Sequence, residues 1–456
     1  MNTNASIKTI NPYNNQFLKE YKLHTDSELT QLLSTSNETF YKWRQTSIKE
    51  RARLLDNLAQ ILEDDKHDLA ELMTVEMGKP ITQSISEIEK CLTLCEFYAT
   101  NADDFLADEL IETDASESFI SYDPLGPILA IMPWNYPFWQ VMRFAIPTLT
   151  AGNTAILKHA SNVTGCALAI EKLFEKAGYP KGCFTTILAD HETVEKLIEN
   201  DIIKAVTLTG SEKAGRSIAA TAGQYLKKTV LELGGNNACI VLDDANLEKY
   251  MDTMVNARMQ NTGQSCIAAK RFIVTENIYD TFVSQFKDKV AALKCGDPMD
   301  KQTTIGTLAR ADLGDILKKQ IDDSVKLGAT IVTGNKQKDA YFEPTIITNI
   351  TPKMPVFNEE TFGPVAVIMK VKNAEEAFKM AALTKYGLGT MVFTQNIEMA
   401  ETYVDMVEDG AYFINELVKS DARLPFGGTK ASGYGRELSK EGIHEFVNRK
   451  TVFIKY

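Results

Sequence analysis

Short apolar runs that alternate with helical segments constrain the fold of this chain more than any other feature. "TAILKHA" at 154–160 is followed by "GCALAIEKLFEKAG", "FTTILAD" at 184–190 by "TVEKLIEN", and "KAVTLTG" at 204–210 by "SEKAGRSIAATAG". Apolar runs of this length suit strands that are buried on both faces, and the segments between them have helical spacing. Strand and helix in alternation predict βαβ units and a parallel sheet, so we expect an α/β protein.

The same alternation resumes later in the chain, with a helix expected at 246–260 and strands near 271–276 and 365–370. Two α/β units in series are therefore predicted, with their junction near Glu232. Residues 26–107 precede the first unit, and their apolar positions recur at intervals of three and four, as in amphipathic helices.

Two further segments have the pattern of strands. Residues 118–134, "SFISYDPLGPILAIMPW", contain two β-rich runs on either side of Asp123-Pro124-Leu125-Gly126, which predicts a hairpin or strand pair with a Pro/Gly turn. The C-terminal "RKTVFIKY" at 449–456 alternates and lies beyond the helices of its unit. We expect this strand to pair with another segment or with another subunit, because an uncovered strand edge needs a partner.

Composition narrows the class of protein and of partner. The chain has 456 residues, 44% hydrophobic and 24% charged, which suits a globular protein of two or three domains. No basic leader precedes an apolar run, and no apolar run approaches the roughly 20 residues that cross a bilayer, so a cytoplasmic protein without membrane contact is expected. A net charge of −12 without a dominant Lys/Arg run disfavours nucleic acid as a partner. A small molecule is the expected ligand.

Seven cysteines are scattered along the chain, namely Cys91, Cys95, Cys166, Cys183, Cys239, Cys266 and Cys295. An odd number at such wide spacing differs from the dense pattern of disulfide-stapled secreted domains, so we expect reduced thiols. Only Cys91 and Cys95 lie close together, and no second pair or group of histidines completes a zinc site. No metal is expected.

Cys266 lies in "NTGQSCIAAKRF", between a Gly-Gln-Ser turn and a stretch of small residues. Taken alone, such a cysteine is more often an inert buried thiol than a nucleophile. Glu232, before two glycines, is by itself more often an exposed loop acid, and "MPWNYPFWQVMR" at 132–143 more often an aromatic corner of the core. None of these stretches alone identifies a function.

The dinucleotide motif G-x-G-x-x-G follows none of the expected strands. Residues 210–217, "GSEKAGRS", resemble a phosphate-binding P-loop but carry Arg216 where that motif requires lysine, so an NTPase is only weakly indicated. The segment is still a strand that ends at the N-terminus of a helix. Exposed backbone N–H groups there favour an anion or a ribose phosphate.

Seven motifs that occur together in a fixed order indicate a function that no single stretch identifies. They are "PWNYP", "GNTAILKHAS", "VTLTGSEKAGRSIA", "LELGGNNACIVLDDA", "NTGQSC", "EETFGPV" and "LPFGGTKASGYGREL". Through them the chain resembles the NAD(P)-dependent aldehyde dehydrogenase superfamily over essentially its whole length, and within it the succinate-semialdehyde dehydrogenases. Members of this family bind dinucleotides without the G-x-G-x-x-G motif, which accounts for its absence.

The resemblance implies an aldehyde-dehydrogenase-like α/β fold in three parts. They are a Rossmann-like NAD(P)-binding domain from residues 1–113 and 129–231, an α/β catalytic domain from 232–419, and a small oligomerisation β-sheet from 114–128 and 437–456. Residues 420–436 would form an active-site loop that returns to the cofactor domain. A homodimer or homotetramer is expected.

The resemblance also implies a catalytic mechanism. Cys266 would add to the aldehyde carbon to give a thiohemiacetal. The side-chain amide of Asn135 and the backbone N–H of Cys266 would form the oxyanion hole. After hydride transfer, Glu232 would activate the water that hydrolyses the thioester to a carboxylic acid.

Cofactor contacts are implied as well. Trp134 would form a wall of the site, and Lys158 would hold the adenosine ribose. The remaining implied contacts are Gly210 and Ser211 at the pyrophosphate, Glu360 and Phe362 at the nicotinamide ribose and ring, and Leu233.

Ser161 bears on the choice between NADP and NAD. Many NAD-preferring relatives place a glutamate three residues after the lysine, where it accepts hydrogen bonds from the ribose hydroxyls. A serine hydroxyl can donate to a 2′-phosphate, and Lys158 adds positive charge nearby. We therefore predict that NADP is accepted and preferred, and the alternative is a site that uses both cofactors indifferently. The segment "ILADHE" lacks a glycine that many relatives carry.

Arg143, eight residues after Asn135, matches an arginine that faces the acyl end of the substrate in semialdehyde dehydrogenases. It could grip a carboxylate bidentately, or it could pair with a nearby acid. Ser420 is a second candidate for the substrate site. Semialdehyde dehydrogenases often carry another arginine six residues before the cysteine, where this chain has Gln260.

Four alternatives to this substrate and mechanism stay open. The enzyme could oxidise another small aldehyde, or it could pass the thioester to coenzyme A, although Glu232 as a positioned base favours water. A non-catalytic binding protein on the same fold would not need Cys266, Asn135 and Glu232 together. A Cys–His hydrolase would need one of five histidines beside the cysteine, which a sequence alone does not reveal.

Overall fold

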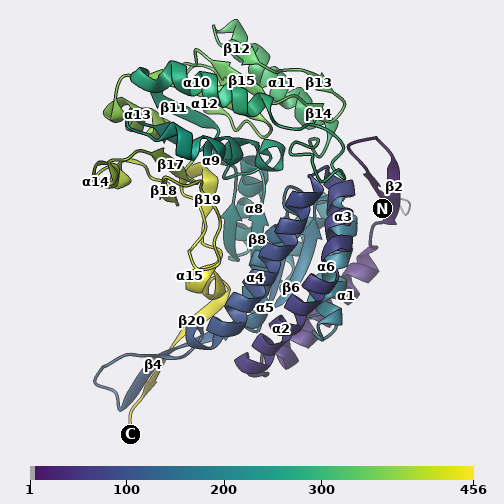
Figure 1. The fold of residues 1–456 in the computed structure, drawn as a ribbon. Coiled ribbons are helices and arrows are strands. Elements are labelled where there is room, and N and C mark those ends of the chain that lie inside the picture. The colour runs from purple at the N-terminus through teal and green to yellow at the C-terminus, as the bar shows by residue number, and fades with distance from the viewer. Residues whose placement is uncertain (1–5) are drawn as a thin grey trace.

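The computed structural model describes residues 6–456, which form two large α/β units and a smaller sheet that projects from them (Figure 1). The unit at the centre of the view is built on a six-stranded sheet, and the unit at the top on a seven-stranded sheet. The prediction of an α/β protein with parallel sheets is confirmed.

The six-stranded sheet has the order β19-β9-β8-β5-β6-β7. All neighbouring strands are parallel except β19, which runs antiparallel to β9. Its central strands are buried on both faces, because helices cover both sides. The strands are β5 (Pro127–Met132), β6 (Thr154–His159), β7 (Phe184–Thr186), β8 (Ala205–Thr209), β9 (Lys228–Glu232) and β19 (Gly433–Tyr434).

Helices of this unit follow the predicted alternation with its strands. They are α5 (Trp139–Thr150), η1 (Ser161–Val163), α6 (Thr164–Lys176), α7 (His191–Glu199) and α8 (Glu212–Gln224). The predicted helical opening is also confirmed, as α1 (Asp26–Trp43), α2 (Ile48–Asp64), α3 (Lys66–Met77) and α4 (Ile81–Phe105). Helix α4 packs against α2 and α5, and through this packing it reaches the site described below.

The seven-stranded sheet has the order β12-β15-β16-β11-β10-β17-β18, and only β12 is antiparallel to its neighbour. Its strands are β10 (Ala238–Val241), β11 (Arg271–Thr275), β12 (Thr330–Thr333), β15 (Thr345–Thr348), β16 (Val365–Val371), β17 (Thr390–Phe393) and β18 (Tyr412–Ile414). Its helices are α9 (Leu247–Met259), η2 (Gln260–Gly263), α10 (Glu276–Ala291), α11 (Ala311–Lys326), α12 (Pro355–Asn358), α13 (Ala374–Ala382), α14 (Ile397–Glu401) and η3 (Val404–Met406).

Three antiparallel strands, β3 (Glu109–Leu110), β4 (Glu117–Pro124) and β20 (Val447–Ile454), form the projecting sheet at the lower left of Figure 1. The C-terminal strand thus pairs with another segment of the chain, which was one of its two expected partners. The remaining elements are the pair β1 (Ser6–Ile10) and β2 (Phe17–Lys22), the pair β13 (Gln337–Lys338) and β14 (Tyr341–Phe342), η4 (Lys430–Ser432) and α15 (Ser439–His444).

The predicted hairpin over 118–134 is wrong, although both of its strands exist. Strand β4 pairs with β3 and β20, whereas β5 lies between β6 and β8 in the six-stranded sheet. Gly126 separates them with a φ of +143°, and its N–H donates to Asn153 Oδ1 at 3.0 Å. This bond ties the chain to the start of β6, so β5 continues into the large sheet instead of turning back along β4.

Among residues 6–456, no helix combines the length and the apolar character needed to cross a membrane. Within the same residues, no group of three or more His, Cys, Asp or Glu side chains is arranged to hold a metal ion.

Candidate active site

The candidate residues lie just beyond the carboxyl ends of the parallel strands of the six-stranded sheet. Asn135 follows β5, Gly210 follows β8, and Glu232 is the last residue of β9. Strands β6 and β7 lie on one side of β5, and β8 and β9 on the other, so the strand order reverses between β5 and β8. Open α/β sheets bind ligands in the crevice at such a switch point.

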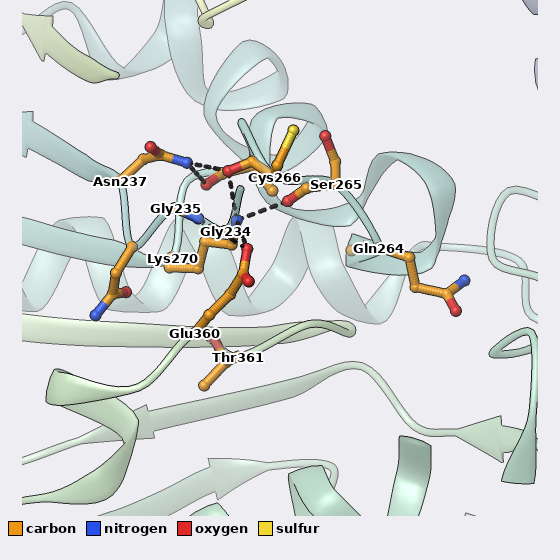
Figure 2. A network of polar contacts seen from close by, with 12 residues as sticks. Gly234, Gly235, Asn237, Gln264, Ser265, Cys266, Lys270, Glu360 and Thr361 are labelled. Carbon is orange, nitrogen blue, oxygen red and sulfur yellow. Dashed lines mark hydrogen bonds and ion pairs between the residues drawn. The ribbon is translucent and has the colours of Figure 1, made fainter. Parts of the chain in front are cut away.

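Cys266 follows η2 in a tight turn that is held by two side chains, Asn237 and Lys270 (Figure 2). Its carbonyl oxygen accepts hydrogen bonds from Asn237 Nδ2 at 2.6 Å and from Lys270 Nζ at 2.7 Å. Asn261 and Thr262, just before the turn, both have a φ of +54°. A β-branched residue such as threonine is strained in this conformation, and strain of this kind concentrates at functional sites.

A cavity of about 280 Å³ is lined by Cys266 together with residues of α4, α5 and α9. Burial raises the pKa of the Cys266 thiol to about 11, and the nearby positive charges of Arg143 and Lys270 oppose that rise. No histidine lines this cavity within the described chain. The nearby His159 is instead buried against the carbonyl oxygens of Met132 and Pro137, so the geometry does not favour a Cys–His hydrolase.

Asn135 is buried beside the same turn. Its Nδ2 donates to the carbonyl of Gln264 at 3.1 Å, two residues before Cys266. Its own carbonyl accepts a hydrogen bond from Asn261 Nδ2 at 2.7 Å. The structure therefore brings Asn135 and Cys266 together, with an amide donor next to the thiol-bearing turn.

Glu232 is almost fully buried, and neither of its carboxylate oxygens has a hydrogen-bond partner in the described chain. Burial, and then repulsion from Glu437, hold the pKa of Glu232 well above its usual range, while the charges of Arg143 and Arg436 act in the opposite direction. A Cβ at Gly427 would lie only 2.8 Å from Glu232 Oε1, so only glycine leaves the carboxylate this space. A carboxylate with raised proton affinity and free oxygens has the properties that a general base requires.

Lys270 connects the cysteine turn to Glu360 (Figure 2). Its fully buried Nζ donates to the carbonyls of Ser265 at 2.6 Å and Cys266 at 2.7 Å, and it forms a 3.0 Å ion pair with Glu360. The same Glu360 oxygen accepts the backbone N–H of Gly235 at 3.1 Å. Glu360, a predicted ribose contact, is thus linked through Lys270 to the turn that carries Cys266.

The other predicted cofactor residues line the strand ends. Trp134 and Phe362 meet edge to face, with ring centroids 5.6 Å apart. Gly210 donates its N–H to the carbonyl of Glu232 at 2.9 Å, and the hydroxyl of Ser211 accepts the N–H of Ala214 at 3.3 Å as the N-cap of α8. Leu233 packs against Gly215, where a Cβ would come within 2.6 Å of the leucine side chain.

Lys158 and Ser161 lie at the end of β6. Lys158 is only 7% exposed, yet its Nζ has no hydrogen bond or ion pair with the described residues. Burial lowers the pKa of Lys158, and the carboxylate of Asp190 opposes this effect. An ammonium that is nearly buried and lacks an acid partner fits ribose hydroxyls or a phosphate, so the chain's own residues fit a dinucleotide here.

Arg143 and Ser420 both line the cavity, but their partners differ. Arg143 forms an ion pair with Glu437, and its guanidinium lies 4.7 Å from the ring centroid of Phe426. This is the pairing with a nearby acid that the sequence left open. Ser420 Oγ accepts hydrogen bonds from Lys90 Nζ at 2.8 Å and from Trp139 Nε1 at 3.0 Å.

Sequence reasoning missed three charged residues of the site, namely Lys90, Lys270 and Glu437. Lys270 had a detectable signal, since a lysine between "CIAA" and "RFIV" is a charge in an otherwise apolar segment, and buried charges need partners. Lys90 and Glu437 occur among other charged residues, and only the folded structure distinguishes them.

Comparison with known proteins agrees with the geometry. The sequence profile described as "Aldehyde dehydrogenase family" matches residues 1–452. A probable NADP-dependent succinate-semialdehyde dehydrogenase from Synechocystis sp. is 47% identical over 98% of this chain and 100% of its own length. A protein of the same activity from Mycobacterium tuberculosis is 44% identical over 98% of this chain and 99% of its own.

A solved structure is also similar to this chain over its whole length. The succinic semialdehyde dehydrogenase from Streptococcus pyogenes, crystallised in complex with NADP+, superposes with a TM-score of 0.96 and is 38% identical. The match covers 99% of this chain and 100% of that one. On the profile, the identities and the shared architecture, this chain belongs to the aldehyde dehydrogenase family.

Proposed function

We propose that the protein oxidises succinate semialdehyde to succinate with NADP+ as the hydride acceptor. The relatives named above support both the substrate and the cofactor. The single observation that carries the proposal is that Cys266 opens on a cavity whose wall contains three cationic side chains, Lys90, Arg143 and Lys419. A thiol supplies the chemistry for an aldehyde, and positive charge attracts a substrate that also bears a carboxylate.

The first step is addition of Cys266 Sγ to the aldehyde carbon, with the thiol proton released to water. A carbon–sulfur bond forms, and the carbonyl oxygen takes up negative charge. Asn135 Nδ2 and the backbone N–H of Cys266 stabilise this oxyanion, since donors fixed in a water-poor site are most effective where charge develops. Lys270 and Arg143 favour the thiolate, because their charges lower the pKa of the cysteine.

When bound, NADP+ would serve as the hydride acceptor, and a thioester would remain on Cys266. The residues that would hold it are Trp134, Lys158, Ser161, Gly210, Ser211, Leu233, Glu360 and Phe362. They follow the strand ends or face the cysteine turn, and Lys158 contributes a positive charge without an acid partner.

The last step is hydrolysis of the thioester. Glu232 takes a proton from water, the resulting hydroxide adds to the thioester carbon, and the carbon–sulfur bond breaks to release the acid. The thiolate of Cys266 leaves and takes the proton back from Glu232, which regenerates both groups. Because burial raises the pKa of Glu232, its carboxylate is a stronger base than that of an exposed glutamate. A water-activating base at this position favours hydrolysis over transfer to coenzyme A.

A substrate panel tests the proposal. We expect kcat/KM for succinate semialdehyde to exceed that for butanal, which has the same carbon chain without the carboxylate, and NADP+ to be used in preference to NAD+. Equal or higher kcat/KM for butanal would reject succinate semialdehyde as the substrate and leave the enzyme as a dehydrogenase of another small aldehyde.

We also propose that the projecting sheet mediates a homodimer or homotetramer. Its outer strands β3 and β20 leave apolar side chains in solvent, with Leu110 77% and Phe453 52% exposed. An uncovered strand edge with apolar residues favours association. Sedimentation equilibrium measures the subunit number directly, and a monomer would contradict the proposal.

A further inference from the structure

Lys90 projects from α4 into the wall of the cavity that contains Cys266. Its Nζ lies 2.8 Å from Ser420 Oγ and 4.1 Å from the ring centroid of Trp139. Among residues 6–456, no carboxylate oxygen lies within 4.0 Å of this ammonium. The cavity wall therefore carries one positive charge without an ion-pair partner.

The other cations of the cavity are already compensated. Arg143 is paired with Glu437 and has Glu232 nearby. Lys419 forms a 3.2 Å ion pair with Glu416, and half of its side chain is exposed. Lys90 is therefore the cavity cation that has no ion-pair partner among the described residues and can pair with an anionic group of a bound ligand.

The hydroxyl of Ser420 is a second hydrogen-bond donor beside the ammonium of Lys90. The serine oxygen accepts from both Lys90 Nζ and Trp139 Nε1, so its two lone pairs are occupied. Its own O–H remains available to donate, and Lys90 retains two of its three N–H donors. Donors from two adjacent side chains match the two oxygens of a carboxylate.

We propose that Lys90, together with Ser420, binds the carboxylate of the semialdehyde and is the residue that determines specificity for an acidic substrate. The inference rests on the proposed function. In this arrangement Lys90 on α4 supplies a positive charge that Gln260, at a position where semialdehyde dehydrogenases often carry an arginine, does not supply.

The proposal predicts a dependence on pH. Burial, and then repulsion from Arg143, lower the pKa of Lys90 to about 8, and Cys91, Glu87 and Asp421 act in the opposite direction. A cation with this pKa is charged at neutral pH and becomes neutral in alkali. KM for succinate semialdehyde is therefore expected to rise as the pH passes about 8, while KM for butanal does not.

Lys90→Met and Lys90→Arg test the assignment directly. Lys90→Met is expected to lower kcat/KM for succinate semialdehyde by about tenfold or more, the loss typical when a hydrogen bond to a charged group is removed, and to leave butanal oxidation little changed. Lys90→Arg retains a charge at alkaline pH, so it is expected to restore binding and to abolish the rise in KM. Lys419→Met is the matched control, because it removes a compensated charge from the same cavity.

The outcomes separate this inference from the proposed function. A native enzyme that does not prefer succinate semialdehyde to butanal rejects both. A native enzyme with that preference, whose Lys90→Met variant loses activity equally toward the two aldehydes or toward neither, rejects the role of Lys90 alone. If Lys90→Met does not fold, the native pH series decides, since a KM for succinate semialdehyde that stays flat through about pH 8 overturns the proposal.

Discussion

Ser161 begins η1, two residues beyond the end of β6, and offers a hydroxyl where a carboxylate would exclude a 2′-phosphate. Ser161→Glu should therefore shift preference from NADP+ to NAD+. The variant loses a charge-assisted hydrogen bond worth about 1.5–3 kcal/mol, which corresponds to about 10- to 150-fold in the ratio of kcat/KM values.

The assay is kcat/KM for each cofactor at saturating succinate semialdehyde, in the native enzyme and the variant. Ser161→Gln is the matched control, because it has the shape of glutamate without the charge and isolates repulsion from crowding. If the NADP+/NAD+ ratio of Ser161→Glu equals that of the native enzyme, Ser161 does not contact the 2′ position, and the preference arises elsewhere.

Substitutions at the proposed catalytic residues give three further tests. Cys266→Ala should abolish turnover and retain NADP+ binding, measured by quenching of intrinsic fluorescence, and substantial residual turnover would falsify the nucleophile assignment. Glu232→Gln should give a burst of NADPH in stopped flow followed by a slow steady state, whereas loss of the burst would place Glu232 in an earlier step. Because burial and Glu437 raise the pKa of Glu232, the folded protein keeps a proton that the unfolded chain releases. Stability should therefore fall as the pH rises from the unfolded toward the folded pKa, and Glu232→Gln should flatten this decline in thermal melts; an unchanged slope would contradict it.

Local patterns predicted the elements of the fold well but not all of their partners. The strands β6, β8, β11 and β16 and the helix α9 lie where apolar spacing placed them, because each is specified by a few neighbouring residues. The prediction of a hairpin over 118–134 was wrong because a Pro/Gly turn has the same sequence pattern whether the chain reverses direction or passes into another sheet. Strand β4 pairs with β3 and with β20, and β20 lies more than 300 positions away, so this pairing leaves no local signature.

The candidate site shows the same difference between local patterns, which a sequence reveals, and long-range contacts, which it does not. Ordered motifs drew attention to Cys266 and Asn135, which the structure brings together around one turn. Arg143 was expected to face the substrate, but a pairing with Glu437 depends on two segments that meet only after folding. Nothing in the sequence indicated that Lys90 belongs to the site, because a lysine on an amphipathic helix is usually a solvated surface residue. Only the folded structure reveals the cavity beside it.

The pairing of β19 with β9 has a consequence for the order in which the site can assemble. Glu232 is enclosed by Gly427 and paired with Gly433, which both lie far later in the chain. The turn that carries Cys266 is held instead by Asn237 and Lys270, which are close to it in the sequence. The surroundings of the thiol can therefore form before those of the buried carboxylate, and a variant truncated before Phe426 should retain the first and lack the second.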